Sequence, residues 1–319
     1  RLGSDGIAAA VVTAQAVKKP VKFFWRREDE FGQGWYRPAQ AARLKAALDA
    51  DGRVLGLHVR TAGPALSASF SPQGLPAGQL DGSSVQTIRE SRYRPGAFHV
   101  EWVRVDQPVP MAPWRSVGAT QNGYFLECFV DEVARAAGRD PYQLRREWLA
   151  HDARALNVLD AAAKAAGWEK PPAKGRARGM AFVESYGSLC AEVAEVSLRA
   201  GRPFVHRVVC ALDCGSIVLP DGVRSQVEGG IVQGLSAVLG EAVNIAAGGA
   251  QERNFDTYPL LRISDAPESI ETIIIESGEA MGGVGEPPLP PLAPAVVNAL
   301  VALTGQPIRE LPLSRHKFA

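Results

Sequence analysis

GGVGEPPLPP, residues 282–291, places a single carboxylate, Glu286, between flexible glycines and a rigid run of prolines. Glycines allow positive φ angles or close approach to a ligand, and prolines fix the path of the chain that follows. Such a frame can hold one acid at a set position in a cavity wall, where it can act as a general base. The alternative is a surface turn with an exposed glutamate.

A second glycine-rich stretch, QVEGGIVQG at residues 226–234, lies within a segment that reads as a helix. Paired glycines inside a helix cost about 1 kcal/mol each relative to alanine. Close approach of the backbone to a ligand or to a neighbouring element is the usual compensation. On a helix, Gln226, Gly230 and Gly234 share one face, and Gln233 lies one step round from it. The alternative to a ligand is tight helix–helix packing.

The third stretch, WRSVGATQN at residues 114–122, leads directly into another helical segment. A helix N-terminus preceded by an arginine and small polar residues can bind an anion. A capped loop without a ligand explains the same residues.

Composition excludes several classes of function. The chain has 319 residues, 22% of them charged, and a formal net charge of +1, so nothing indicates capture of nucleic acid. No apolar run approaches the roughly 20 residues of a membrane span. The four cysteines form no CxxC pair and read as small buried hydrophobes, and the five histidines are scattered. We therefore expect no protein-ligated metal site; a metal would arrive on its own organic ligand.

The pattern of elements predicts an α+β fold, because helices and hairpins are mixed without regular βαβ alternation. We expect residues 1–106 to complete one half and residues 107–319 to form a second. The predicted helices cover 4–18, 121–137, 140–149, 154–166, 222–243 and 294–304. The predicted strands are a buried one at 21–25 followed by a charged turn at 26–30, a hairpin of 43–47 with 54–61, one at 100–105, and two or three within 179–217.

Taken together, the three stretches resemble the molybdopterin-binding subunit of the xanthine oxidase and aldehyde oxidase family. GVGEPP is the signature of that family around its catalytic glutamate, QVEGGIVQG resembles its cofactor-binding helix, and WRSVG resembles its FRGFG or YRGAG loop. Asp213-Cys214-Gly215 matches a strand end of the same family. The segments VKFFWRREDE, YRPAQAARLKAALDADGRV and AEVAEVSLRAGRPFVHRVVCALDCG resemble the isoquinoline 1-oxidoreductase branch of the family, in its beta subunit, so the likeness runs from end to end.

The resemblance implies roles for particular residues. It makes Glu286 the active-site base and places Gln226 where the family contacts a pterin cytosine dinucleotide. It implies that the remaining cofactor contacts come from the same three stretches, namely Arg115, Ser116, Gly118, Gly229, Gly230, Gln233 and Gly285. The two glycine-rich stretches around Arg115 and Gln226 must then lie on the same side of the molecule.

The implied activity is hydroxylation of an aldehyde or an N-heteroaromatic carbon, with water as the oxygen source. The implied cofactor is molybdopterin with molybdenum, in the cytosine dinucleotide form. Its electrons would pass to [2Fe–2S] clusters on a small iron–sulfur partner subunit. In this reading the protein supplies positioning and base catalysis, and the cofactor carries the redox step.

The family's GGGFGR loop would end at Arg1, and its xEMGQG stretch would lie further upstream. We therefore expect the N-terminal half of the molybdopterin subunit to be a partner of this chain. The interface should bury more than the roughly 1,000 Å² of a specific contact. One alternative is a non-catalytic assembly half that does not hold cofactor alone. A generic helix-rich binding module is disfavoured by the joint presence of the three stretches. The substrate, and cytoplasm against periplasm, stay open.

Overall fold

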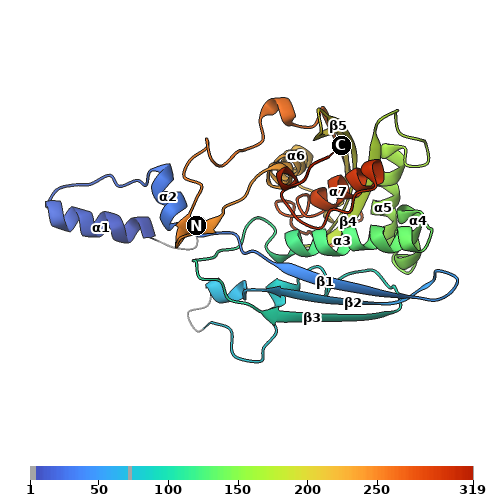
Figure 1. Cartoon of the computed structure of the whole chain (residues 1–319), viewed down its shortest axis with the longest axis horizontal. Coiled ribbons are helices and arrows are strands. Elements are labelled where there is room, and N and C mark those ends of the chain that lie inside the picture. The colour runs from blue at the N-terminus through green and yellow to red at the C-terminus, as the bar shows by residue number, and fades with distance from the viewer. Residues whose placement is uncertain (1–4, 71–73, 319) are drawn as a thin grey trace.

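The computed structural model describes residues 5–70 and 74–318, which form two sheets with helices between and around them (Figure 1). This arrangement confirms the α+β prediction. A separate two-stranded ribbon, β7 (Ile245–Ala246) with β8 (Gly249–Ala250), lies beyond the main layers. No helix of the described ranges is long and apolar enough to cross a bilayer.

The first sheet has the order β1-β2-β3, with β1 at Ala41–Leu48, β2 at Val54–Gly63 and β3 at Ala97–Arg104. The β1–β2 hairpin forms at the predicted turn, where Gly52 takes a φ of 76°. The strand β3 then pairs parallel to β2. One face of the sheet packs on the helical layer through Leu57 and Val59, and the other face carries polar side chains.

The second sheet has the order β4-β5-β6-β9, and three of its strands form an antiparallel meander. The last strand, β9, lies parallel to β6. Helices cover both faces, which explains why the strands are buried almost along their whole length. The strand bounds are Ala177–Ser185 for β4, Ser188–Arg199 for β5, Arg202–Asp213 for β6 and Ser269–Ile274 for β9.

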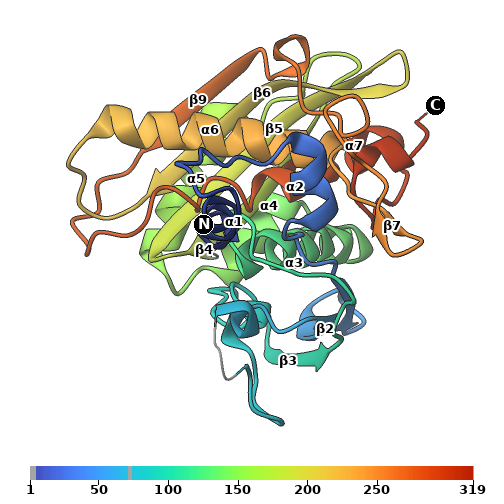
Figure 2. The same cartoon turned by 90° about the vertical axis from the view of Figure 1, so that its left-hand side faces the viewer.

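Helices α3, α4 and α5 cover one face of the second sheet, and α6 and α7 cover the other (Figure 2). The layer of α3 to α5 also covers the first sheet, so one apolar cluster joins residues on both sides of position 106. The division at residues 106/107 accordingly stays a prediction. The helix bounds are Gly118–Ala136 for α3, Pro141–Trp148 for α4, Ala153–Ala166 for α5, Pro220–Leu239 for α6 and Leu292–Thr304 for α7.

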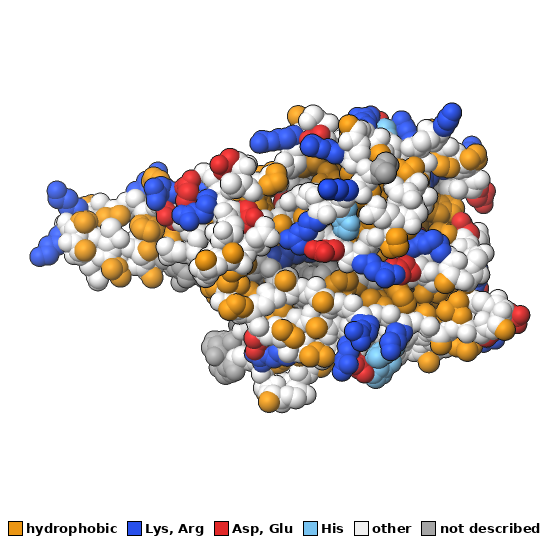
Figure 3. Space-filling view, in the orientation of Figure 1, with side chains coloured by type: hydrophobic (Ala, Val, Ile, Leu, Met, Phe, Trp, Pro, Cys, Tyr) orange, Lys and Arg blue, Asp and Glu red, His pale blue; other side chains and the backbone are white. Residues whose placement is uncertain are grey.

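The N-terminal segment departs from the prediction. Helix α1 (Asp5–Val17) forms as expected but projects from the body, with Ile7 and Val12 about two thirds exposed (Figures 1 and 3). The predicted strand at 21–25 is wrong: the segment pairs with no described strand, and Phe24 is 73% exposed. The predicted charged turn is wrong in part, because α2 (Arg27–Gln33) begins within it behind a capping box of Arg26 and Asp29.

Short 3₁₀ turns complete the described chain. They lie at Ser67–Phe70, Gly82–Val85, Ile263–Asp265 and Leu313–Arg315. The first two lie in the segment between β2 and β3. The second of them, Gly82–Val85, matters for the site because it lies against the start of α3.

Candidate active site

The loop before α3 has an unusual backbone. Ser116 and Val117 have φ angles of 71° and 48°, a region that residues with a side chain rarely adopt. A Cβ on Gly118, the first residue of α3, would lie 1.8 Å from the carbonyl oxygen of Ser83, so only glycine fits there. The Thr120 hydroxyl donates to the Arg115 carbonyl at 2.8 Å and closes the turn. This loop carries Arg115, whose side chain bonds to residues of two other segments.

Arg115 connects the three glycine-rich stretches. Its Nε donates to the carbonyl oxygen of Gly285 at 2.6 Å, and its Nη2 also donates to that oxygen. Its Nη1 donates to Gln233 Oε1 at 3.0 Å, and its Nη2 donates to Gln226 Oε1 at 3.1 Å. The expectation that the stretches around Arg115 and Gln226 lie on one side of the molecule is confirmed.

Helix α6 approaches the Glu286 loop at Gly230. A Cβ at this position would lie 3.1 Å from Pro288 Cβ and 3.5 Å from Arg115 Nη2, so the absence of a side chain lets helix and loop pack closely. The preceding residue, Gly229, is exposed, and a Cβ there would meet nothing within 4 Å. The glycine pair therefore packs on one side and leaves open backbone on the other.

The loop that carries Glu286 is fixed by its backbone. The buried Ser116 hydroxyl donates to the Glu286 carbonyl at 2.7 Å, and Leu289 N–H donates to the same oxygen at 3.1 Å. Pro287 and Pro288 are buried, whereas Glu286 is half-buried. The carboxylate thus stands on a rigid support with part of its surface accessible to a ligand.

Two neighbouring groups respond to the charge of Glu286. Burial lowers the pKa of Arg115, and the Glu286 carboxylate opposes that shift. Burial raises the pKa of Tyr186, a hydrogen bond with Gln86 opposes the rise, and the charge of Glu286 adds to it. Tyr186 was not among the predicted site residues. It lies in the β4–β5 hairpin turn, and its carbonyl accepts from Gly283 N–H at 2.8 Å.

A second support lies at the end of β6. Arg154 Nε donates to Asp213 Oδ2 at 2.8 Å, and Gly215 N–H donates to Asp213 Oδ1 at 2.9 Å. Burial opposes ionisation of Asp213, but these bonds outweigh it and lower its pKa. The carbonyl of the next residue, Cys214, accepts from Gly282 N–H at 2.8 Å. The Asp213-Cys214-Gly215 segment therefore anchors the start of the Glu286 loop.

The predicted site residues divide into two groups. Contacts join Arg115 to Gly285, Gln226, Gly230 and Gln233, and they join Ser116 to Glu286. The other two stand apart: Gly118 faces the 3₁₀ turn at Gly82–Val85, and Gly229 faces open space.

This arrangement suits a polar, phosphate-bearing heterocycle. A guanidinium and two side-chain amides converge beside exposed helix backbone that has no side chain to block close approach. Amides and a guanidinium offer the donors that ring nitrogens, carbonyl oxygens and phosphates accept. Arg115, Gln226 and Gln233 therefore fit a pterin cofactor in their chemistry.

Two family models, both described as a molybdopterin cofactor-binding domain, match the chain at residues 5–149 and at residues 129–267. The chain is 33% identical to the beta subunit of isoquinoline 1-oxidoreductase from Brevundimonas diminuta over 98% of its own length and 41% of that protein. It is 31% identical to a subunit of nicotinate dehydrogenase from Pseudomonas putida over 98% of its length and 28% of that protein. It thus spans less than half of these relatives.

The fold is similar to that of a solved chain in quinoline 2-oxidoreductase from Pseudomonas putida 86. The TM-score is 0.78 at 13% identity, and the alignment covers 96% of this chain and 64% of the other. At that identity the similarity concerns the fold alone.

Proposed function

The chain belongs to the molybdopterin cofactor-binding subunits of the xanthine oxidase and aldehyde oxidase family, and on that premise we propose that it forms the catalytic part of a molybdenum hydroxylase. The proposed substrate is an aldehyde or an N-heteroaromatic compound, hydroxylated at an electron-poor carbon with oxygen from water. Two of the relatives are named for isoquinoline and nicotinate, and these names favour an N-heteroaromatic compound.

One observation carries the proposal: Arg115 bonds at once to the Gly285 carbonyl and to the side chains of Gln226 and Gln233. These three segments lie far apart in the chain, and each can be explained separately without a ligand, as a capped loop, a packed helix and a surface turn. Those separate explanations do not account for their convergence on one guanidinium. A ligand bound by all three segments beside an acid accounts for it.

In this proposal Glu286 is the general base that accepts a proton during the oxidation. Arg115 binds the carbonyl of Gly285, the residue before Glu286, and Ser116 binds the carbonyl of Glu286 itself. A base held in this way needs no reorganisation when the proton moves, and general-base catalysis is typically worth 10²–10⁴-fold. Burial and the nearby carboxylate raise the pKa of Tyr186, which keeps its phenol protonated and able to donate a hydrogen bond to substrate.

For the cofactor we propose molybdopterin with molybdenum in the cytosine dinucleotide form. Gln226, Gln233 and Arg115 would hold its polar atoms, and Gly229 and Gly230 would let it lie against the α6 backbone. When bound, the cofactor supplies the two-electron oxidation chemistry. This chain supplies the contacts that orient the cofactor and the carboxylate that takes the proton.

For partners we propose a small iron–sulfur subunit with [2Fe–2S] clusters and the N-terminal half of the molybdopterin subunit. The second partner is supported by α1, where Ile7, Val11 and Val12 are each at least 49% exposed (Figure 3). An exposed apolar patch of this kind commonly marks an interaction site.

The test is to measure oxygen transfer and cofactor content in the complete enzyme. Turnover of an N-heteroaromatic substrate in H₂¹⁸O should place ¹⁸O in the product, and acid hydrolysis should release CMP in a 1:1 ratio with molybdenum. Product oxygen from O₂ would refute the hydroxylase assignment. Release of no cytidine nucleotide would refute the dinucleotide form, and absence of molybdenum would support the non-catalytic alternative.

A further inference from the structure

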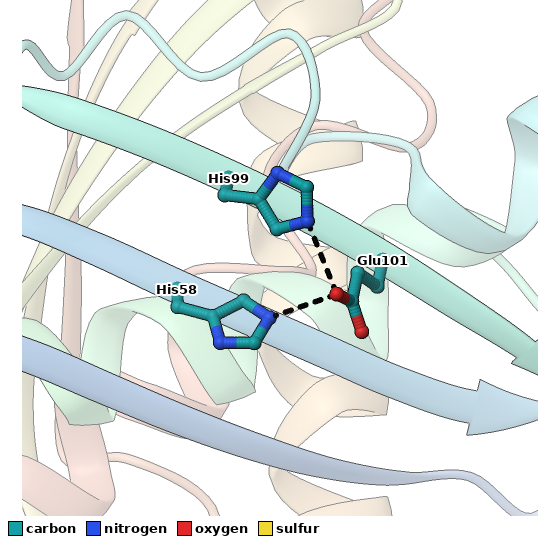
Figure 4. Close-up of side chains that lie close together, drawn as sticks. All are labelled: His58, His99 and Glu101. Atoms are coloured by element: carbon teal, nitrogen blue, oxygen red, sulfur yellow. Dashed lines mark hydrogen bonds and ion pairs between the residues drawn. The ribbon is translucent and has the colours of Figure 1, made fainter.

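A cluster of metal-ligating side chains lies on the outer face of the first sheet, on the opposite side from the face that packs on α3. It consists of His58 on β2 with His99 and Glu101 on β3 (Figure 4). The parallel register pairs His58 with His99, and Glu101 follows His99 by two residues, so the three side chains share one face. None of them belongs to the proposed cofactor site.

The donor atoms converge on one carboxylate oxygen. Glu101 Oε1 lies 3.1 Å from His99 Nε2 and 3.4 Å from His58 Nε2. Zinc bonds to imidazole and carboxylate are about 2.0–2.1 Å, which gives about 3.3 Å between neighbouring ligands of a tetrahedral site. The two distances are therefore close to those of a ligand set around one metal ion.

Two further features are typical of a ligand set. His58 Nε2 is enclosed by protein and makes no hydrogen bond with the described residues, although it forms an ion-pair contact with Glu101 Oε1 at 3.4 Å. The second carboxylate oxygen of Glu101 accepts from Arg60 Nε at 2.8 Å, which orients the carboxylate so that Oε1 faces the imidazoles. Hydrogen bonds of this kind position metal-binding carboxylates.

The charges around the cluster must permit a cation. Arg60 Nε lies 2.8 Å from Glu101 Oε2 and places one positive charge beside the carboxylate. Arg43 and Lys45 on β1 share the exposed face, but both side chains are solvated and their repulsion is screened.

We propose that His58, His99 and Glu101 bind one Zn²⁺ ion, with the fourth coordination position open to water. Two histidines and one glutamate are a known set of three protein ligands for zinc. The ion connects β2 to β3, and because it binds only the folded sheet it stabilises the protein by mass action. The proposal stands independently of the proposed function.

Equilibrium dialysis of the complete enzyme against buffered micromolar Zn²⁺ tests the proposal, with zinc counted per chain by mass spectrometry. One ion should bind to the natural enzyme and raise its melting temperature. His58→Ala, His99→Ala and Glu101→Gln should each weaken binding by about tenfold or more. His151→Ala changes an exposed histidine outside the cluster and should retain the ion.

X-ray absorption at the zinc edge adds an independent measurement. It should show two imidazole nitrogens and an oxygen shell at about 2.0–2.1 Å. If the natural enzyme binds no zinc under these conditions, the proposal fails. It also fails if the His58→Ala/His99→Ala double variant binds zinc as tightly as the natural enzyme does. Should one alanine variant not fold, His99→Gln serves in its place.

Discussion

Replacing Glu286 with glutamine should remove the base and leave its support intact. The loop is held by bonds to backbone carbonyls, from Arg115 to Gly285 and from Ser116 to Glu286 at 2.7 Å. Neither bond uses the Glu286 carboxylate, and glutamine keeps its size. We therefore expect Glu286→Gln to fold normally and to retain its full content of molybdenum.

The expected loss in kcat is about 10²–10⁴-fold, the usual contribution of a general base. At about 1.4 kcal/mol for each factor of ten, this is about 3–5 kcal/mol of transition-state stabilisation. The attraction between the half-buried Glu286 and Arg115 is worth only about 0–1 kcal/mol to folding after screening. The kinetic loss should thus far exceed any change in the free energy of unfolding.

The assay is steady-state turnover of an N-heteroaromatic substrate by the complete enzyme, with molybdenum measured in the same preparations. KM should change far less than kcat, because the proton moves only in the transition state. Glu276→Gln and Glu279→Gln are matched controls, since both residues are exposed, and both should keep full turnover. Near-full activity of a metal-loaded Glu286→Gln enzyme refutes the base assignment, and loss of the metal shows a structural role instead.

Three further outcomes are expected. Arg145→Leu should lower the free energy of unfolding by about 3–5 kcal/mol in denaturant titrations, because Glu127 and Asp131 would stay buried without their guanidinium. Burial raises the pKa of Glu192, so the folded state holds its proton longer than the unfolded state and stability falls as pH rises above about 4.3. Glu192→Gln should flatten that slope in denaturation series from pH 5 to pH 8, and an unchanged slope would contradict the reasoning. Arg115→Lys should lower kcat for the same substrate by about tenfold to a hundredfold, because one ammonium cannot span the contacts of a guanidinium fork.

Apart from α2, the α-helices were predicted, because their ends are encoded locally. Asp140 caps α4 with its side chain and Pro141 takes the first turn, while Gly167 ends α5 in the left-handed conformation. Strands depend on partners that lie elsewhere in the chain. The apolar segment 21–25 has strand-like composition but pairs with no described strand, whereas β9 was not predicted and forms because β6 offers a free edge.

The candidate site was predictable to the extent that it consists of contiguous motifs. Arg115, Gln226 and Glu286 each lie in a recognisable stretch, and the structure brings those stretches together. Tyr186 lies in no such stretch. It comes under the influence of the Glu286 charge because its hairpin turn bonds to Gly283. The same holds for His58 and His99, which lie far apart in the sequence and become neighbours through strand register.

The position of Arg115 changes what the family resemblance alone would assign to it. The resemblance makes it a cofactor contact, yet its hydrogen bonds go to the Gly285 carbonyl and to two glutamines that are themselves predicted cofactor contacts. Any ligand that draws Gln226 or Gln233 toward itself must therefore compete with, or reinforce, the bonds that hold the Glu286 loop. Cofactor binding and placement of the base are physically coupled through this one side chain. Loading of the cofactor should consequently change how firmly the Glu286 loop is held, because both depend on the bonds of Arg115.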